Sequence, residues 1–195
     1  MECGAKEPTV TWFADLSPCS YFATRDWPDG CADVLRSVGW LSADHAYTQG
    51  QIEPTERERL AQLLENHWDF CFFCGLHTCE LCLAHDSNGS LFVPSKHVIF
   101  VAPVAIGHYI DVHGYLPPRE FLDAVLGCPA MGSDTYLSAL VNGGGKAFAL
   151  MTGLLEEPAP CPYCGKPLIT PRARLCHYCK MDWHDPEHPR RLGAA

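Results

Sequence analysis

Cysteine and histidine side chains, the residues that bind soft and borderline metal ions, are unusually frequent in this chain. Its 195 residues include twelve cysteines and ten histidines. Eight of the cysteines form pairs with the spacing Cys-x2-Cys, in which one tight turn can direct two thiolates at the same ion. The pairs are Cys71/Cys74, Cys79/Cys82, Cys161/Cys164 and Cys176/Cys179. Since the sequence starts without a secretory leader and is long for a disulfide scaffold, we expect cytoplasmic metal binding and not disulfides.

The last two pairs predict a zinc ribbon. Cys161/Cys164 and Cys176/Cys179 are separated by eleven residues, and Gly165 follows the first pair, where it can relax the turn. Four thiolates complete a tetrahedral shell, so this Zn2+ is expected to be structural. A module of this size buries too little surface to fold alone, and the metal would supply the folding free energy.

A second Zn2+ per chain is expected at Cys79 and Cys82. His108 and His113 have a His-x4-His spacing that matches the second half of Cys2His2 sites. Three alternatives remain. Cys71 and Cys74 could complete a four-cysteine site, His77 could replace one of the later histidines, or the thiols and histidines could be core residues without a metal.

The openness of this first site would decide between two functions. A closed shell makes the zinc structural. An open shell would leave a position for water, whose pKa zinc lowers to about 7, and Glu80 or Asp111 could then serve as the general base of a hydrolase.

The fold class expected from the pattern is α+β: a small mixed domain with a zinc knuckle, followed by the four-cysteine ribbon. A capping box of Thr55 and Glu58 predicts a helix beginning at Pro54. Residues 91–93 and 97–102 predict a β-hairpin. Residues 104–115 predict a helix that ends at Gly114.

Four further elements are expected from turn signals and apolar residues. Residues 9–18 predict a strand and a turn, and residues 37–41 a buried strand. A helix beginning at Pro117 places Phe121, Leu122, Val125 and Leu126 on its apolar side. Ser133 or Asp134 caps a last helix, which the glycines of residues 142–145 are expected to break.

Charge divides the chain at the proline-rich segment 158–160. Residues 1–157 carry 8 basic and 20 acidic side chains, a balance of −12, whereas residues 158–195 carry 6 and 3, a balance of +3. We expect two domains with these bounds. The acidic domain should repel nucleic acid, and the ribbon offers a modest basic patch for phosphate or an acidic surface. The basic residues are Lys166, Arg172, Arg174, Lys180, Arg190 and Arg191.

Several short motifs form a recognisable set. They are Ala14-Asp-Leu-Ser-Pro18 with Tyr21-Phe22, Val38-Gly-Trp-Leu41 with His45, His77-x-Cys79-Glu-x-Cys82, His108-Tyr109, and His113-x-Tyr115-x-Pro-Pro118 with Phe121. Over about residues 10–127 this set resembles a family of uncharacterised bacterial proteins. The resemblance implies that the ligand candidates and His77 belong to one constellation that leaves out Cys71 and Cys74. It implies no activity.

Known catalytic signatures do not fit the chain. Residues 143–146 lack the first glycine and the hydroxyl residue of a phosphate loop, and Pro186 interrupts the His-x-x-Glu-His match at residues 184–188. The leading hypothesis is therefore an interaction or regulatory module with two structural zinc ions and a protein partner. Nucleic acid is a further candidate partner through the ribbon. No apolar run approaches the roughly 18 residues of a membrane span.

Overall fold

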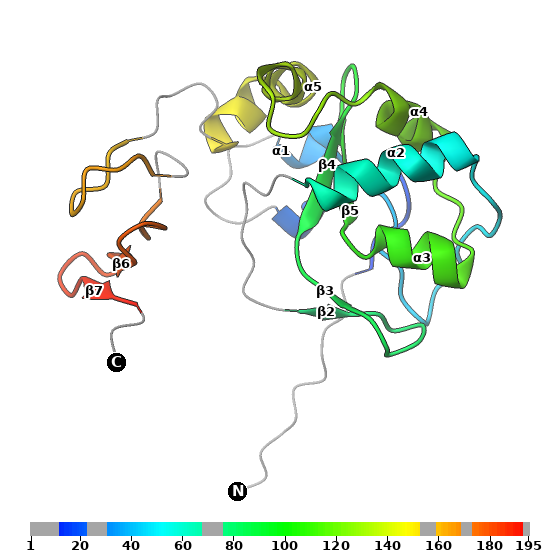
Figure 1. Cartoon of the computed structure of the whole chain (residues 1–195), viewed down its shortest axis with the longest axis horizontal. Coiled ribbons are helices and arrows are strands. Elements are labelled where there is room, and N and C mark those ends of the chain that lie inside the picture. Colours follow the sequence, from blue (N-terminus) through cyan, green and yellow to red (C-terminus); the bar gives the residue numbers. More distant parts are fainter. Residues whose placement is uncertain (1–11, 23–30, 68–75, 153–158, 169–172, 193–195) are drawn as a thin grey trace, which may run out of the picture.

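The computed structural model describes residues 12–22, 31–67, 76–152, 159–168 and 173–192 (Figure 1). These residues form short strands and helices that alternate along the chain. In order they are η1 (Ser20–Phe22), α1 (Cys31–Val34), β1 (Leu35–Ser37), α2 (Pro54–Glu65), β2 (His77–Thr78), β3 (Asp86–Ser87), β4 (Ser90–Pro94), β5 (Ile99–Pro103), α3 (Ile106–His113), α4 (Arg119–Gly127), α5 (Asp134–Thr152), β6 (Met181–Asp182) and β7 (Arg190–Arg191).

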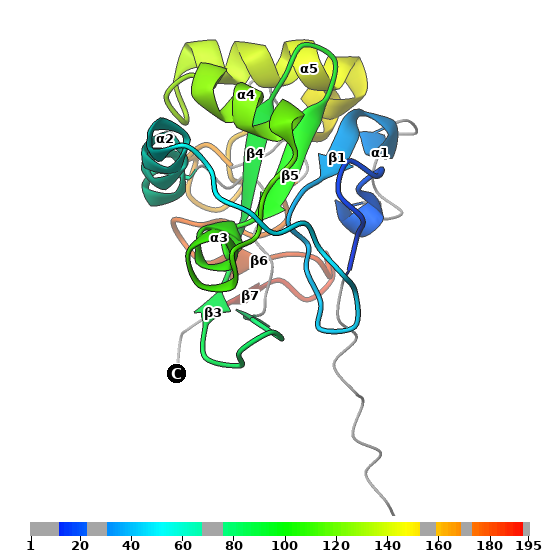
Figure 2. The same ribbon diagram turned by 90° about the vertical axis from the view of Figure 1, so that its right-hand side faces the viewer.

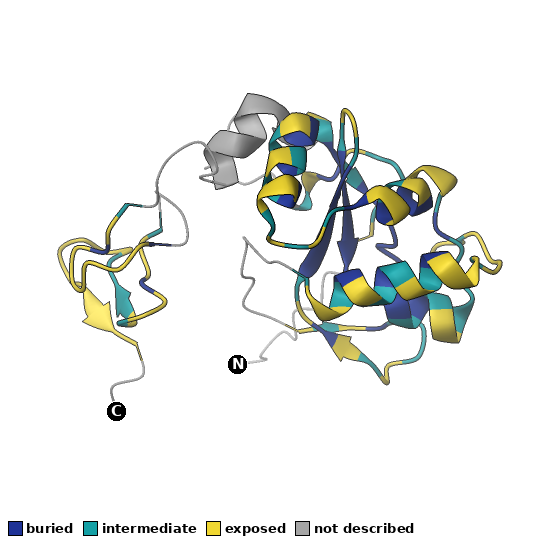
Figure 3. Cartoon of the chain, turned by 45° about the horizontal axis from the view of Figure 1, so that its top comes forward, coloured by how far each residue is buried: buried dark blue, intermediate teal, exposed yellow. Residues whose placement is uncertain are grey.

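A three-stranded sheet in the order β1-β5-β4 forms the centre of the body. β4 and β5 are antiparallel, as the sequence predicts, and β1 joins β5 in parallel. Every residue of β4 and β5 is buried, which is typical of strands covered on both faces. Both strands are dark blue in Figure 3, the colour of buried residues. On β5, Phe100 meets the ring of Phe121 from α4 at 6.0 Å, while the neighbouring Ile99 faces α5. The chain is therefore of mixed α+β class.

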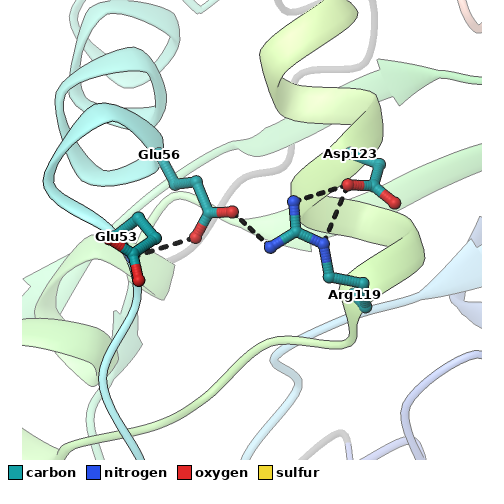
Figure 4. Close-up of polar contacts among 4 residues, drawn as sticks. All are labelled: Glu53, Glu56, Arg119 and Asp123. Carbon is teal, nitrogen blue, oxygen red and sulfur yellow. Dashed lines mark hydrogen bonds and ion pairs between the residues drawn. The ribbon is translucent and has the colours of Figure 1, made fainter.

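Helix α2 begins at Pro54, as the sequence predicts, but its capping residue differs from the predicted one. Glu53 is the N-cap, and its amide donates to the carboxylate of Glu56 at 3.0 Å, so the predicted box of Thr55 and Glu58 is wrong. Glu56 is buried, and Arg119 of α4 pairs with it (Figure 4). Because the guanidinium compensates the buried carboxylate, the cap also joins α2 to α4.

The two N-terminal strand predictions need correction. Residues 9–11 lie outside the described residues, and from residue 12 the chain forms a turn closed by Ser17, whose hydroxyl donates to the carbonyl of Ala14 at 2.7 Å. The buried strand is β1, which ends at Ser37. The chain leaves the sheet there because Gly39 takes a left-handed conformation, with φ of +70°, although residues 38–41 stay buried as expected.

A single carboxylate connects three of the motifs. Oδ1 of Asp15 accepts hydrogen bonds from the amide of Gly39 and from the hydroxyl of Tyr115, both at 2.9 Å. Burial raises the pKa of Asp15, because desolvation penalises its charged form. Trp40 directly follows Gly39, and its indole donates a hydrogen bond to the carbonyl of Val101 in β5 at 2.9 Å. These motif residues hold the N-terminal turn against the sheet and the end of α3.

The C-terminal helices also differ in detail from the expectation. Leu126 of α4 is 45% exposed and does not belong to the buried face formed by Phe121, Leu122 and Val125. Ser133 caps α5 through a hydrogen bond from the amide of Tyr136. The glycines do not break α5, because Gly143 lets it approach the turn between β4 and β5 closely (Figure 2).

Residues 159–168 and 173–192 form a small C-terminal part of the structure, which we call the ribbon. Its hairpin pairs β6 with β7, and its own small apolar cluster contains Cys161, Leu168 and Cys176. Within the described parts of the chain, no helix combines the length and the apolar character needed to cross a membrane.

Replacing Gly143 with alanine should destabilise the body despite the better helix propensity of alanine. The new Cβ would lie 2.7 Å from the carbonyl oxygen of Ser95 and 3.0 Å from that of Val98, and backbone atoms cannot move aside cheaply. We expect a loss of about 1–3 kcal/mol in the free energy of unfolding, measured by urea denaturation. Gly127→Ala is the control, since nothing lies within 4 Å of its Cβ position. Equal stabilities of the two variants would contradict the close approach.

Candidate metal centres

Cys79, Cys82, His108 and His113 converge on one point. Their ligand atoms all lie within 4.8 Å of one another, so the four residues could hold a metal ion. Cys79 is buried and the other three are half-buried. We call this group the body cluster.

The distances within the body cluster fit a tetrahedral ion. Zinc bonded to nitrogen at about 2.0 Å and to sulfur at about 2.3 Å would separate two nitrogens by about 3.3 Å, and a nitrogen from a sulfur by about 3.5 Å. The Nε2 atoms of His108 and His113 are 3.1 Å apart. Nε2 of His113 lies 3.4 Å from Sγ of Cys79, and Nε2 of His108 lies 3.3 Å from Sγ of Cys82.

Helix α3 positions the two histidines. His108 is the third residue of this helix and His113 is its last residue, after which Gly114 ends the helix in the left-handed conformation with φ of +63°, as predicted. Arg57 of α2 pairs with both carboxylate oxygens of Asp111, which fixes α3 against α2 between the histidines. The hydroxyl of Tyr47 donates to the carbonyl of His113 at 3.3 Å.

A short loop presents the two cysteines. The amide of Cys79 donates to the carbonyl of His85 at 2.8 Å, and the amide of Leu83 donates to the carbonyl of Cys79 at 2.7 Å. These bonds close the turn, and Leu83 takes a positive φ of 57° to complete it. The ring of His85 stacks on that of His108, with centroids 4.2 Å apart. The loop therefore contacts α3 beyond the ligand atoms themselves.

His77 lies beside the body cluster but outside the group of four. Its Nε2 atom is 2.8 Å from the hydroxyl of Tyr109, a buried residue of α3. Burial lowers the pKa of His77, which favours the neutral ring. Cys71 and Cys74, the other alternative ligands, lie outside the described residues.

Both candidate general bases are engaged in hydrogen bonds. Arg57 binds Asp111 and holds the pKa of this carboxyl below its ordinary value. Oε2 of Glu80 accepts a hydrogen bond from the amide of Ala43 at 3.2 Å. In this arrangement the two carboxylates support neighbouring backbone and helices, as the residues around a metal site often do.

The four ribbon cysteines form a second cluster, with all ligand atoms within 4.8 Å of one another. Sγ of Cys161 lies 3.8 Å from that of Cys179, and Sγ of Cys164 lies 3.6 Å from that of Cys176. A tetrahedral four-thiolate zinc would separate its sulfurs by about 3.8 Å. We call this group the ribbon cluster.

Backbone amides favour thiolates in the ribbon cluster. Hydrogen bonding, foremost from the amide of Cys179, lowers the pKa of Cys176 to about 6. Although the amide of Lys166 acts in the same direction at Cys164, burial and the neighbouring thiols raise the pKa of Cys164 to about 11. Cys164 therefore holds its proton more tightly than Cys176, and a bound cation would replace that proton.

Comparison with known families shows that the body cluster lies within a family domain. The sequence model of the family described as "Domain of unknown function (DUF7919)" matches residues 11–126. The chain belongs to this family. The match includes all four residues of the body cluster and ends before the ribbon. No curated protein and no solved structure matches the chain significantly.

Sequence reasoning missed three contributors to the body cluster. His85 and Arg57 carry no local signal, because a stacked ring and an ion pair between two helices depend on the tertiary arrangement. Tyr109 stands in a motif beside His108, and that position was the available signal for its contact with His77. Of the six basic ribbon residues, Arg172 lies outside the described residues.

Each cluster should bind one metal ion independently. We expect two ions per chain by native mass spectrometry, and one ion after either Cys79→Ser or Cys176→Ser, because each substitution removes a ligand from one cluster. Cys128→Ala is the control: this buried cysteine belongs to neither cluster, so both ions should remain. Retention of two ions by Cys79→Ser would contradict the body cluster as a metal centre.

Proposed function

We propose that this protein is a zinc-binding interaction or regulatory module in which both zinc ions are structural. Two cysteines with two histidines, and four cysteines, are the donor sets that zinc occupies in closed tetrahedral sites. The distances in both clusters support this choice of metal. Each ion would have four protein ligands and no position for a substrate.

A structural role for the body zinc agrees with the residues around it. A hydrolase would need both an open coordination position and a general base free to accept a proton. Asp111 is held by Arg57 and Glu80 by the amide of Ala43. The same contacts fix the loop and the helix that carry the ligands, which is what a structural centre requires.

The observation that carries the interaction role is a set of exposed aliphatic residues adjoining the body-cluster motifs in sequence, which we call the aliphatic rim. Leu76, Leu83 and Val112 are 71%, 75% and 61% exposed. Leu83 directly follows the ligand Cys82, Val112 directly precedes the ligand His113, and Leu76 precedes His77. Exposed aliphatic side chains gathered around one site mark a protein-binding surface.

A groove adjoins this rim. It has a volume of about 470 Å³ and lies between α2, α3 and the loop after β3. Leu64, Val104 and Val112 form its apolar part, and His108 reaches it from the cluster. An apolar side chain of a partner could enter the groove while the rim contacts the surface around it. The acidic charge of the body favours a partner whose surrounding surface is basic.

X-ray absorption spectroscopy at the zinc edge would test the closed shells. Averaged over both ions, we expect six sulfur and two nitrogen ligands per two zinc ions, because all eight ligands come from the two clusters. Cys176→Ser isolates the body site, where two sulfurs and two nitrogens are expected. An oxygen ligand at the body site of this variant would contradict the structural role and favour the hydrolase.

The rim should control binding to the protein partner. Crosslinking with the full-length zinc-loaded protein would identify the partner. Titration calorimetry with the purified partner then gives the Kd. We expect Leu83→Ser combined with Val112→Ser to weaken binding at least about tenfold, since central apolar contacts dominate interface energies. Leu126→Ser, an exposed leucine on α4, is the control. An unchanged Kd in the double variant would reject the rim as the interface.

A further inference from the structure

The two turns of the ribbon cluster are structural copies of each other. In the first, the amide of Gly165 donates to the carbonyl of Cys161 at 2.9 Å; in the second, the amide of Lys180 donates to that of Cys176 at 2.8 Å. Gly165 and Lys180 both have positive φ, 71° and 60°. This correspondence places Tyr163 and Tyr178 at the same position of the two turns.

Both tyrosines present their rings to solvent. Tyr163 is 47% exposed and Tyr178 is 54% exposed. Each lies directly before a cysteine of the ribbon cluster, so the metal would hold both turns, and with them both rings, in a fixed arrangement. Tyr163 also packs against Trp183 at 5.6 Å between ring centroids. Two half-exposed rings on a rigid support offer stacking surfaces and not core packing.

Positive charge lies beside the rings. The ammonium of Lys166 sits 4.7 Å from the centre of the Tyr178 ring, and Lys180 follows Tyr178 by two residues. Two of the three acidic residues of the ribbon already have partners: Asp182 pairs with His184 and Arg190, and Asp185 pairs with His188. Within the described residues, Lys166 and Lys180 form no such pair.

We propose that the two turns of the ribbon bind single-stranded nucleic acid, with bases stacking on Tyr163 and Tyr178 and phosphates contacting Lys166 and Lys180. Exposed aromatic rings combined with cations are the features by which proteins hold single strands without reading their sequence. A duplex keeps its bases stacked inside and would use the cations alone. An acidic peptide would use the cations but would have no aromatic faces to stack on these rings. The inference rests on the ribbon zinc of the proposed function and not on the aliphatic rim.

The test measures binding of the full-length zinc-loaded protein to fluorescent oligothymidylate and oligouridylate of about 20 nucleotides, by anisotropy. We expect Tyr163→Ala and Tyr178→Ala each to weaken binding about 5- to 150-fold, while Tyr163→Phe and Tyr178→Phe retain it, because phenylalanine keeps the stacking ring. Lys166→Gln and Lys180→Gly should each reduce the slope of log K against log salt by about 0.7. Glycine suits position 180, where φ is positive.

Lys96→Gln is the charge control, because this exposed lysine lies in the turn between β4 and β5 and should leave binding unchanged. Absent binding, unchanged binding in the alanine variants, tighter binding of duplex DNA, or equal binding of polyglutamate would each overturn the proposal. Native mass spectrometry of the same samples distinguishes a failure of the proposed function from a failure of this inference. If the ribbon zinc is missing, the proposed function fails, and if both zincs are present without binding, only this inference fails.

Discussion

The body depends on one convergence: two sulfur and two nitrogen atoms, from a loop and a helix far apart in sequence, meet within a few ångströms. A bound ion there would connect residues 34 positions apart, from Cys79 to His113. Because the unfolded chain has no preformed site, the free energy of binding the ion would add to the stability of the fold. It would explain how a sheet of only three strands, of which β1 has three residues, supports the surrounding helices.

The other contacts of the body serve the same geometry. Asp15 holds the N-terminal turn to Tyr115, just beyond the end of α3, and Arg57 holds the middle of α3 to α2. Helix α3 is therefore fixed between its two histidines, at Asp111, and just beyond its end, at Tyr115. The hydrogen bond of Asp15 and the ion pair of Arg57 both hold this helix in place, which is consistent with a metal centre that has a structural role.

What the sequence could predict follows from how local each feature is. The spacing within each ligand pair, the hairpin and the end of α3 at Gly114 depend on residues close together in the chain, so the sequence could indicate them. The cap of α2 was predicted two residues too late, because Glu53 and Thr55 can both cap a helix and only the fold selects between them. The continuation of α5 through Gly143 depends on the carbonyl groups of a distant turn, and propensity alone argues for a break. The contacts of His85 and Arg57 could not be predicted for the same reason, because they join segments that are distant in the sequence.

The positive φ of Lys180 has a consequence for how the ribbon can vary. The corresponding position of the first turn is Gly165, the residue type that adopts this conformation without strain. A lysine there costs on the order of 1 kcal/mol, which the surrounding metal ligands can offset because they determine the turn independently. With an ion bound, the backbone geometry of these turns would be set more by coordination than by residue preference. That independence leaves a position on the surface of the turn where selection can place a charge without losing the fold.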